Sequence, residues 1–152
     1  MFDPWQHFGT PEPLNPRPPQ SRTKKSESVK SRRKKVTVVV VDDERVIADT
    51  TKEILKRSGF DAHCAYDGHS GLELAIQLSP DFVLTDVVMP NMNGVQLAIA
   101  LSKALPATEI LLLSGQAGVT EILDRGRREG YTFELIAKPV HPEKLLQRLG
   151  QK

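Results

Sequence analysis

The chain has 152 residues, of which 39% are hydrophobic and 26% charged, so it is long enough for one ordinary domain with a buried core. A single cysteine excludes an internal disulfide, and the sequence holds neither an apolar signal region in its first residues nor a membrane-spanning stretch, so we expect a cytoplasmic protein. The net charge of +2 is unevenly distributed, because residues 1–35 contain nine Lys or Arg against three Asp or Glu, a net +6, which leaves −4 for the remainder.

Residues 1–35 have the composition of a tail. Six of the eleven prolines lie there, a basic cluster follows at Lys30–Lys35, and apolar residues do not recur at a helical or strand period. Such a segment cannot bury enough apolar surface to offset the entropy lost on ordering. We predict a disordered, Pro-rich and then basic N-terminal tail over residues 1–35, followed by a folded domain over residues 36–152. The basic cluster suggests an anionic partner, although solvated charge is the commoner explanation for such a run.

The domain begins with short apolar runs that alternate with amphipathic stretches. Residues 36–41 are almost wholly β-branched, as in a strand covered on both faces, and they lead directly into Asp42 and Asp43. An amphipathic helix then ends at Gly59, which suits the left-handed residue after a helix. A weaker strand over residues 61–65 precedes a second amphipathic helix.

The next apolar run ends in Asp86. Residues 82–84 are too few for a globular helix and predict a buried strand, with Asp86 at its carboxyl end. Pro90 and Gly94 mark a connection, after which helical spacing resumes over residues 95–105. In open α/β sheets the ligand crevice lies outside the carboxyl ends of the strands, so Asp86 is a candidate reactive group. Considered alone, it would be read more simply as an Asp that starts a turn.

Two further pairs of strand and helix complete the domain. Gly126 interrupts the fourth helix at a cost of about 1 kcal/mol relative to Ala. Five strands in strict alternation with five helices predict an α/β fold, a doubly wound parallel sheet with right-handed crossovers and helices on both faces. In this half we expect strands at residues 110–113 and 135–137, followed by Ser114 and Lys138, and helices at residues 119–129 and 143–149.

The strand ends would gather three carboxylates, a hydroxyl and an ammonium on one rim of the sheet: Asp42, Asp43, Asp86, Ser114 and Lys138. Close carboxylates repel one another unless a cation neutralises them, and all-oxygen ligands suit a hard divalent ion such as Mg²⁺. One carboxylate could then attack a phosphoryl group while the metal, the hydroxyl and the ammonium offset the charge of the phosphoryl oxygens. Each residue alone has a simpler interpretation as a helix cap, a turn residue or a solvated strand end. Together they fit phosphoryl transfer to Asp86.

Residues 36–150 resemble a response-regulator receiver domain of two-component signalling, of the chemotaxis-regulator-like kind. The resemblance rests on four motifs in the family's order and spacing: Asp42-Asp43, Asp86-x-x-Met89-Pro90 with Gly94, Ser114-Gly115 and Lys138-Pro139. It implies the flavodoxin-like strand order 2-1-3-4-5, whose switch point lies between the first and third strands.

The resemblance also implies a role for each site residue. Asp86 would be the phosphoacceptor, and Ser114 and Lys138 would hold the phosphoryl oxygens. The Mg²⁺ ligands would be Asp43, Asp42 directly or through water, Asp86 itself and the backbone carbonyl of Val88. A cis peptide bond is expected between Lys138 and Pro139.

The expected function is that of a stand-alone receiver and not of an enzyme. It would accept a phosphoryl group from a sensor histidine kinase or phosphotransfer protein and switch a surface that binds a downstream protein target. Leu135 stands where many receivers carry an aromatic, with Phe133 two residues earlier, which puts the usual aromatic readout in question.

Two other functions are considered. A Mg²⁺-dependent aspartyl-phosphate phosphohydrolase of the haloacid-dehalogenase type would carry a second Asp two residues after the nucleophile, where this chain has Val88, and usually a cap insertion. A nucleic-acid or membrane adaptor driven by the basic tail is compatible with a receiver domain.

Overall fold

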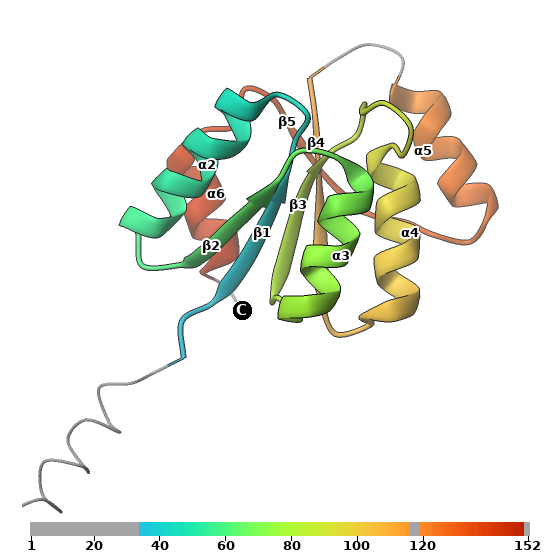
Figure 1. The fold of residues 1–152 in the computed structure, drawn as a ribbon. Helices are drawn as coiled ribbons and strands as arrows, with labels where there is room; N and C mark the ends of the chain where they lie inside the picture. The colour runs from blue at the N-terminus through green and yellow to red at the C-terminus, as the bar shows by residue number, and fades with distance from the viewer. Residues whose placement is uncertain (1–33, 116–118, 151–152) are drawn as a thin grey trace, which may run out of the picture. The chain divides into compact units, whose positions relative to one another are not determined.

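The structure is a computed structural model that describes residues 34–115 and 119–150. The tail predicted over residues 1–35 lies almost wholly outside the described residues. The described residues form five strands and five helices in strict alternation (Figure 1). The elements are β1 (Thr37–Val41), α2 (Arg45–Arg57), β2 (Asp61–Ala65), α3 (Gly68–Leu78), β3 (Phe82–Asp86), α4 (Gly94–Ala104), β4 (Glu109–Ser114), α5 (Val119–Arg128), β5 (Glu134–Ala137) and α6 (Pro142–Leu149).

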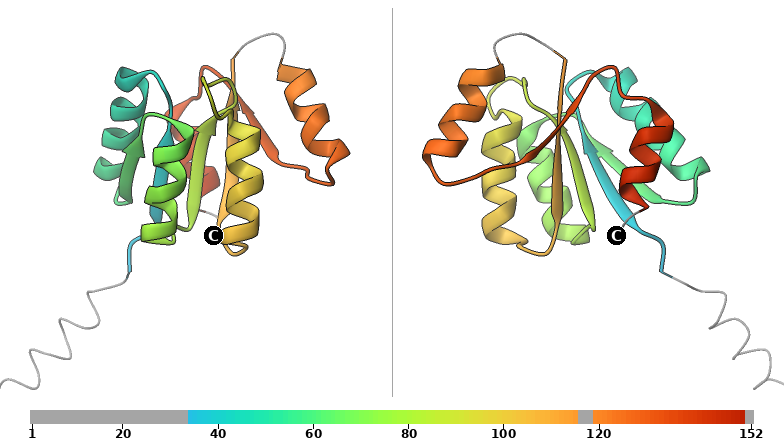
Figure 2. Two further views of the ribbon diagram at one scale, coloured as in Figure 1. Left: turned by 45° about the vertical axis from the view of Figure 1, so that its right-hand side comes forward. Right: turned by 180° about the vertical axis from the view of Figure 1, so that it is seen from behind.

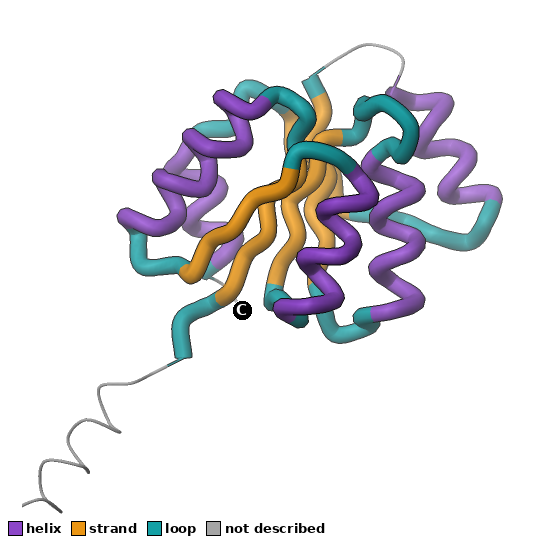
Figure 3. Tube along the Cα trace, in the orientation of Figure 1, coloured by secondary structure: helices purple, strands orange, loops and turns teal. Residues whose placement is uncertain are grey.

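The five strands form one parallel sheet in the order β2-β1-β3-β4-β5, which confirms the predicted fold and strand order (Figure 3). Val41 at the end of β1 is in register with Ala65 of β2 and Thr85 of β3, and Ser114 of β4 is in register with Ala137 of β5. All five strands therefore end at the same edge of the sheet.

Helices cover both faces of the sheet. Helices α2 and α6 lie against one face, while α3, α4 and α5 lie against the other (Figures 1 and 2). The apolar side chains of β1 alternate between the two faces of the sheet. Val38 packs in one core with Leu55 of α2, and Val39 packs in the opposite core with Leu97 of α4. Every residue of β1 is buried, as expected for a strand covered on both sides.

The helix ends follow the chemistry of the sequence. Gly59, which follows the C-cap residue Ser58 of α2, has φ +95°, the left-handed conformation predicted for it. Asp67 caps α3 by accepting a hydrogen bond from the Ser70 backbone N–H at 2.7 Å. None of the helices in the described ranges is both long and apolar enough to span a membrane.

Gly126 has a different role from the predicted one. Helix α5 runs through it without a break, and Gly126 is buried against α4. A Cβ atom at this position would lie 2.8 Å from Cγ1 of Val95. The absence of a side chain therefore lets α5 approach α4 closely, and the prediction that it only weakens the helix was incomplete.

Arg148 links the last helix to the two strands at the far side of the sheet. Its guanidinium pairs with Glu134 of β5 at 2.8 Å and with Glu109 of β4 at 3.6 Å, and it lies 5.7 Å from the centroid of the Phe82 ring. These contacts fix α6 to the first residues of β4 and β5, at the amino-terminal edge of the sheet.

Candidate functional site

Three carboxylates meet at the carboxyl edge of the sheet. Asp42 and Asp43 follow β1, and Asp86 is the last residue of the neighbouring strand β3. One oxygen from each of the three lies within 4.8 Å of the others. Asp42 is buried, with 1% of its surface exposed, whereas Asp43 is exposed and Asp86 is partly buried. The predicted gathering of these three acids is therefore present.

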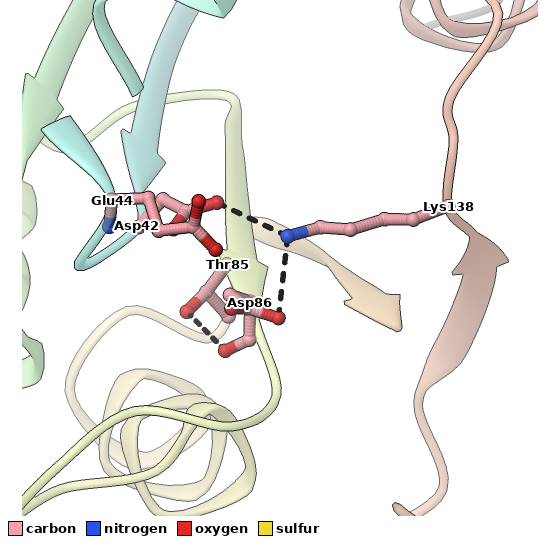
Figure 4. A network of polar contacts seen from close by, with 5 residues as sticks. All are labelled: Asp42, Glu44, Thr85, Asp86 and Lys138. Carbon is pink, nitrogen blue, oxygen red and sulfur yellow. Dashed lines mark hydrogen bonds and ion pairs between the residues drawn. The ribbon is translucent and has the colours of Figure 1, made fainter. Parts of the chain in front are cut away.

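The Lys138 side chain extends from the end of β5 toward Asp42 and Asp86 (Figure 4). Its Nζ lies 3.2 Å from Oδ2 of Asp42 and 3.5 Å from Oδ1 of Asp86. The residue follows β5 directly, and its backbone N–H donates a 2.8 Å hydrogen bond to the carbonyl of Ser114. The bond between Lys138 and Pro139 is cis, as predicted.

The charges of the cluster do not balance. Burial raises the pKa of the Asp86 carboxyl, and the nearby charges of Asp42 and Asp43 add to this effect, so that the attraction of Lys138 does not cancel it. Burial alone would lower the pKa of Lys138, but the combined charges of Asp86 and Asp42 outweigh burial and raise it. Three carboxylates face one ammonium among the contacts of the described residues. A net negative set of oxygen donors fits a hard divalent cation such as Mg²⁺.

Backbone contacts hold the two acid-bearing loops in place. Oδ1 of Asp42 accepts a 2.9 Å hydrogen bond from the Glu44 backbone N–H, and the Asp42 backbone N–H donates to the Ala65 carbonyl at 3.2 Å. In the second loop, the Gly94 N–H donates to the Val87 carbonyl at 2.8 Å. A Cβ atom on Gly94 would collide with the carbonyl oxygen of Asp86, so only glycine permits this approach.

Ser114 and Val88 are less closely joined to the cluster. Ser114 ends β4 between the strands that lead to Asp86 and Lys138, and its described contact with the site is the bond from its carbonyl to Lys138. Val88 lies in the loop after Asp86 and is 40% exposed. The roles predicted for the Ser114 hydroxyl and the Val88 carbonyl stay predictions.

Two features of the site were not predicted. Thr85 is fully buried beside Asp86, and its hydroxyl donates a 3.0 Å hydrogen bond to the Asp86 carbonyl. The sequence indicates this residue only as a hydroxyl side chain inside an apolar strand. A pocket of about 620 Å³ also opens beside Asp86, with walls from α2 and from the segment after β5 that include Val46, Pro139 and Leu145. Val46 is 79% exposed, which marks it as an apolar residue outside the buried face of α2.

Comparison with known proteins identifies this arrangement. The family model described as response regulator receiver domain matches residues 38–150. The chain belongs to the response regulator receiver domain family. As members of two-component signalling systems, receiver domains serve as phosphoacceptors.

Solved receiver domains have the same fold. A CheY-like receiver domain protein from Methanospirillum hungatei JF-1 is 26% identical, with a TM-score of 0.68, and the match covers 78% of this chain and 93% of that one. A receiver domain protein from Clostridium thermocellum is 27% identical, with a TM-score of 0.67, covering 76% and 91%. The receiver domain of the putative response regulator NarL from Mycobacterium tuberculosis is 30% identical, with a TM-score of 0.62, covering 79% and 100%.

Strand β5 of this receiver domain contains no aromatic residue. Leu135 is 45% exposed, so its side chain faces outward on β5. Phe133 packs beside the core cluster that contains Val87 and Val95, and its ring stacks on Tyr131 at a centroid distance of 6.0 Å. The aromatic side chains near β5 therefore lie before the strand and not at the position three residues before Lys138.

Proposed function

We propose that this receiver domain accepts a phosphoryl group on Asp86 with the help of Mg²⁺. The observation that supports this most strongly is the set of three carboxylate oxygens within 4.8 Å of one another, with the Lys138 ammonium against two of the carboxylates. In this proposal Asp42, Asp43, Asp86 and the Val88 carbonyl hold the Mg²⁺ ion. When bound, the ion neutralises negative charge on the transferring phosphoryl oxygens.

Asp86 acts as the nucleophile in this proposal. A carboxylate oxygen forms a bond to phosphorus while the bond from phosphorus to the donor atom breaks, and the donor leaves as imidazole or acetate. Partial burial of Asp86 keeps its carboxylate poorly solvated, which favours attack on an electrophile. Lys138, already 3.5 Å from Asp86, offsets charge on the phosphoryl oxygens, and the Ser114 hydroxyl would do so from the next strand.

The pocket beside Asp86 supports a protein donor, a histidine kinase or a phosphotransfer protein. Its lining includes the apolar residues Val46 of α2 and Leu145 of α6 together with Asp86. A donor helix could bury apolar side chains there while presenting a phosphohistidine to the carboxylate. A histidine kinase that phosphorylates the wild-type protein provides the test. Replacement of Val46 with Glu should slow transfer of the phosphoryl group from this kinase, while labelling by acetyl phosphate stays unchanged.

We further propose that the phosphorylated domain acts by binding a protein target. Phosphorylation would change the relative stability of two arrangements of the domain, and the target would prefer one of them.

Labelling with acetyl phosphate tests the assignment of Asp86. Wild-type protein with Mg²⁺ should gain one phosphoryl group by intact-mass measurement, and the gain should be lost in Asp86→Asn. Asp43→Asn should slow labelling, and added Mg²⁺ should recover part of the rate. The control is Asp67→Asn, because Asp67 is an exposed acid that caps α3 and Asn keeps the cap. Labelling that persists in Asp86→Asn would disprove the assignment.

A further inference from the structure

Tyr66, just beyond the end of β2, contacts two residues one turn apart on α2. Its hydroxyl donates a 2.6 Å hydrogen bond to Oδ1 of Asp49, and Cζ of Arg45 lies 4.2 Å from the centroid of its ring. The Cys64 thiol, partly buried against the core, donates to the same Asp49 oxygen at 3.4 Å. The hydrogen bond from Tyr66, followed by that from Cys64, lowers the pKa of Asp49 and keeps it an ionised acceptor.

Arg45 occupies an unfavourable place for a cation. It is the first residue of α2, where the helix dipole favours negative charge, and the first turn of α2 contains no acidic residue. It also follows Asp43 by only two residues, so its long side chain starts close to the acidic cluster. The ring of Tyr66 offers the guanidinium a cation–π contact in another direction.

Tyr66 is also tied to the loop that carries the acids. The carbonyl of its neighbour Ala65 accepts the hydrogen bond from the backbone N–H of Asp42. The stacked ring, the helix start and the acid-bearing loop therefore form one connected unit at the carboxyl edge of the sheet. A change at Tyr66 would be felt at Asp42 through these contacts.

We infer that Tyr66 is a positioning residue whose ring holds the Arg45 guanidinium away from Asp42, Asp43 and Asp86. The cluster then keeps the excess of negative charge that a divalent cation requires, with Lys138 as its only described counter-charge. Without the ring, Arg45 becomes a second cation beside the acids and competes with Mg²⁺ for them. This inference rests on the proposed Mg²⁺ site and adds a determinant of its affinity.

Isothermal titration of the full-length protein with Mg²⁺, at constant ionic strength, tests the inference. Tyr66→Leu keeps apolar bulk but loses the aromatic face, so its Mg²⁺ dissociation constant should rise about fivefold. Arg45→Ala alone should change it less than about twofold, because the charge is already held away. The double variant should return to within about twofold of wild type, since the competing cation is gone. Tyr66→Phe keeps the face of the ring and should also stay within about twofold.

Two controls separate this effect from simple damage to the fold. Arg57→Ala removes an exposed cation from the other end of α2 and should not restore the affinity of Tyr66→Leu. Thermal unfolding without Mg²⁺ should show that Arg45→Ala does not stabilise Tyr66→Leu. A wild-type protein that binds no Mg²⁺ would refute the proposed function itself. If wild type binds and Tyr66→Leu binds equally well, or if Arg45→Ala fails to restore binding, the role given to Tyr66 is wrong.

Discussion

Replacing Gly126 with Ala tests whether close packing or helix propensity dominates at the contact of α5 with α4. In a free helix the change would stabilise by about 1 kcal/mol. Here the new Cβ atom would lie 2.8 Å from Cγ1 of Val95, which is 3% exposed and, being β-branched, cannot easily turn away. Overpacking of this kind costs about 1–3 kcal/mol, so the net effect should be a loss of about 1 kcal/mol in the free energy of unfolding.

Urea unfolding of a double-mutant cycle measures this directly. In a Val95→Ala background the obstructing methyl group is absent, so Gly126→Ala should stabilise by about 1 kcal/mol, which makes the coupling between the two sites about 2 kcal/mol. Gly59→Ala is the matched control, since Gly59 has φ +95° and no atom within 4 Å of its added Cβ. Its cost should be the same in both backgrounds. A stabilised Gly126→Ala protein that still contains Val95 would refute the packing argument.

Three other outcomes are expected. Lys138→Met leaves the buried Asp42 without its ammonium partner and should lower the free energy of unfolding by about 3–5 kcal/mol. Urea titration without metal measures this loss, and an unchanged unfolding midpoint would contradict the pairing. The raised pKa of Asp86 means that the folded state holds this proton more tightly than the unfolded state, so its contribution to stability falls as pH rises through the ordinary carboxyl pKa toward the folded one. Asp86→Asn should therefore have a higher free energy of unfolding than wild type at neutral pH, and this difference should shrink in acid. A difference that is constant with pH would contradict the raised pKa of Asp86. Deletion of residues 1–35 should leave labelling by acetyl phosphate intact and abolish any salt-dependent binding of DNA, and equal binding by both proteins would exclude the tail as the binding element.

The sheet and the acidic cluster could be predicted because their determinants are local in the sequence. The apolar run of β1 and the one that ends in Asp86 each reveal a buried strand, and strict alternation with helices makes the strands parallel. Parallel strands end at one edge, which is why Asp42, Asp86 and Lys138 were expected together before any distance was known. Their chemical roles stay predictions, since proximity alone does not show phosphoryl transfer.

Other features depend on contacts that no sequence period reveals. Tyr66 meets Arg45 and Asp49 through side-chain directions set by how β2 and α2 pack, and a single aromatic near a strand end gives no sign of them. The sign of the effect at Gly126 likewise depends on where Val95 points across the helix interface. Propensity describes one helix at a time, so it misjudges a residue whose role lies between two helices.

The two halves of the charged site belong to parts of the sheet that differ in local stability. The acids lie at the carboxyl ends of β1 and β3, which are buried interior strands, whereas Lys138 follows β5, a four-residue edge strand that is mostly exposed. Elements with little burial open first in native-state fluctuations, so amides of β5 should exchange with solvent faster than those of β1. Opening of the edge strand would withdraw the ammonium while the carboxylates stay fixed. Local fraying at the margin of the sheet thus becomes a means of changing the electrostatic potential at Asp86 without disturbing the core.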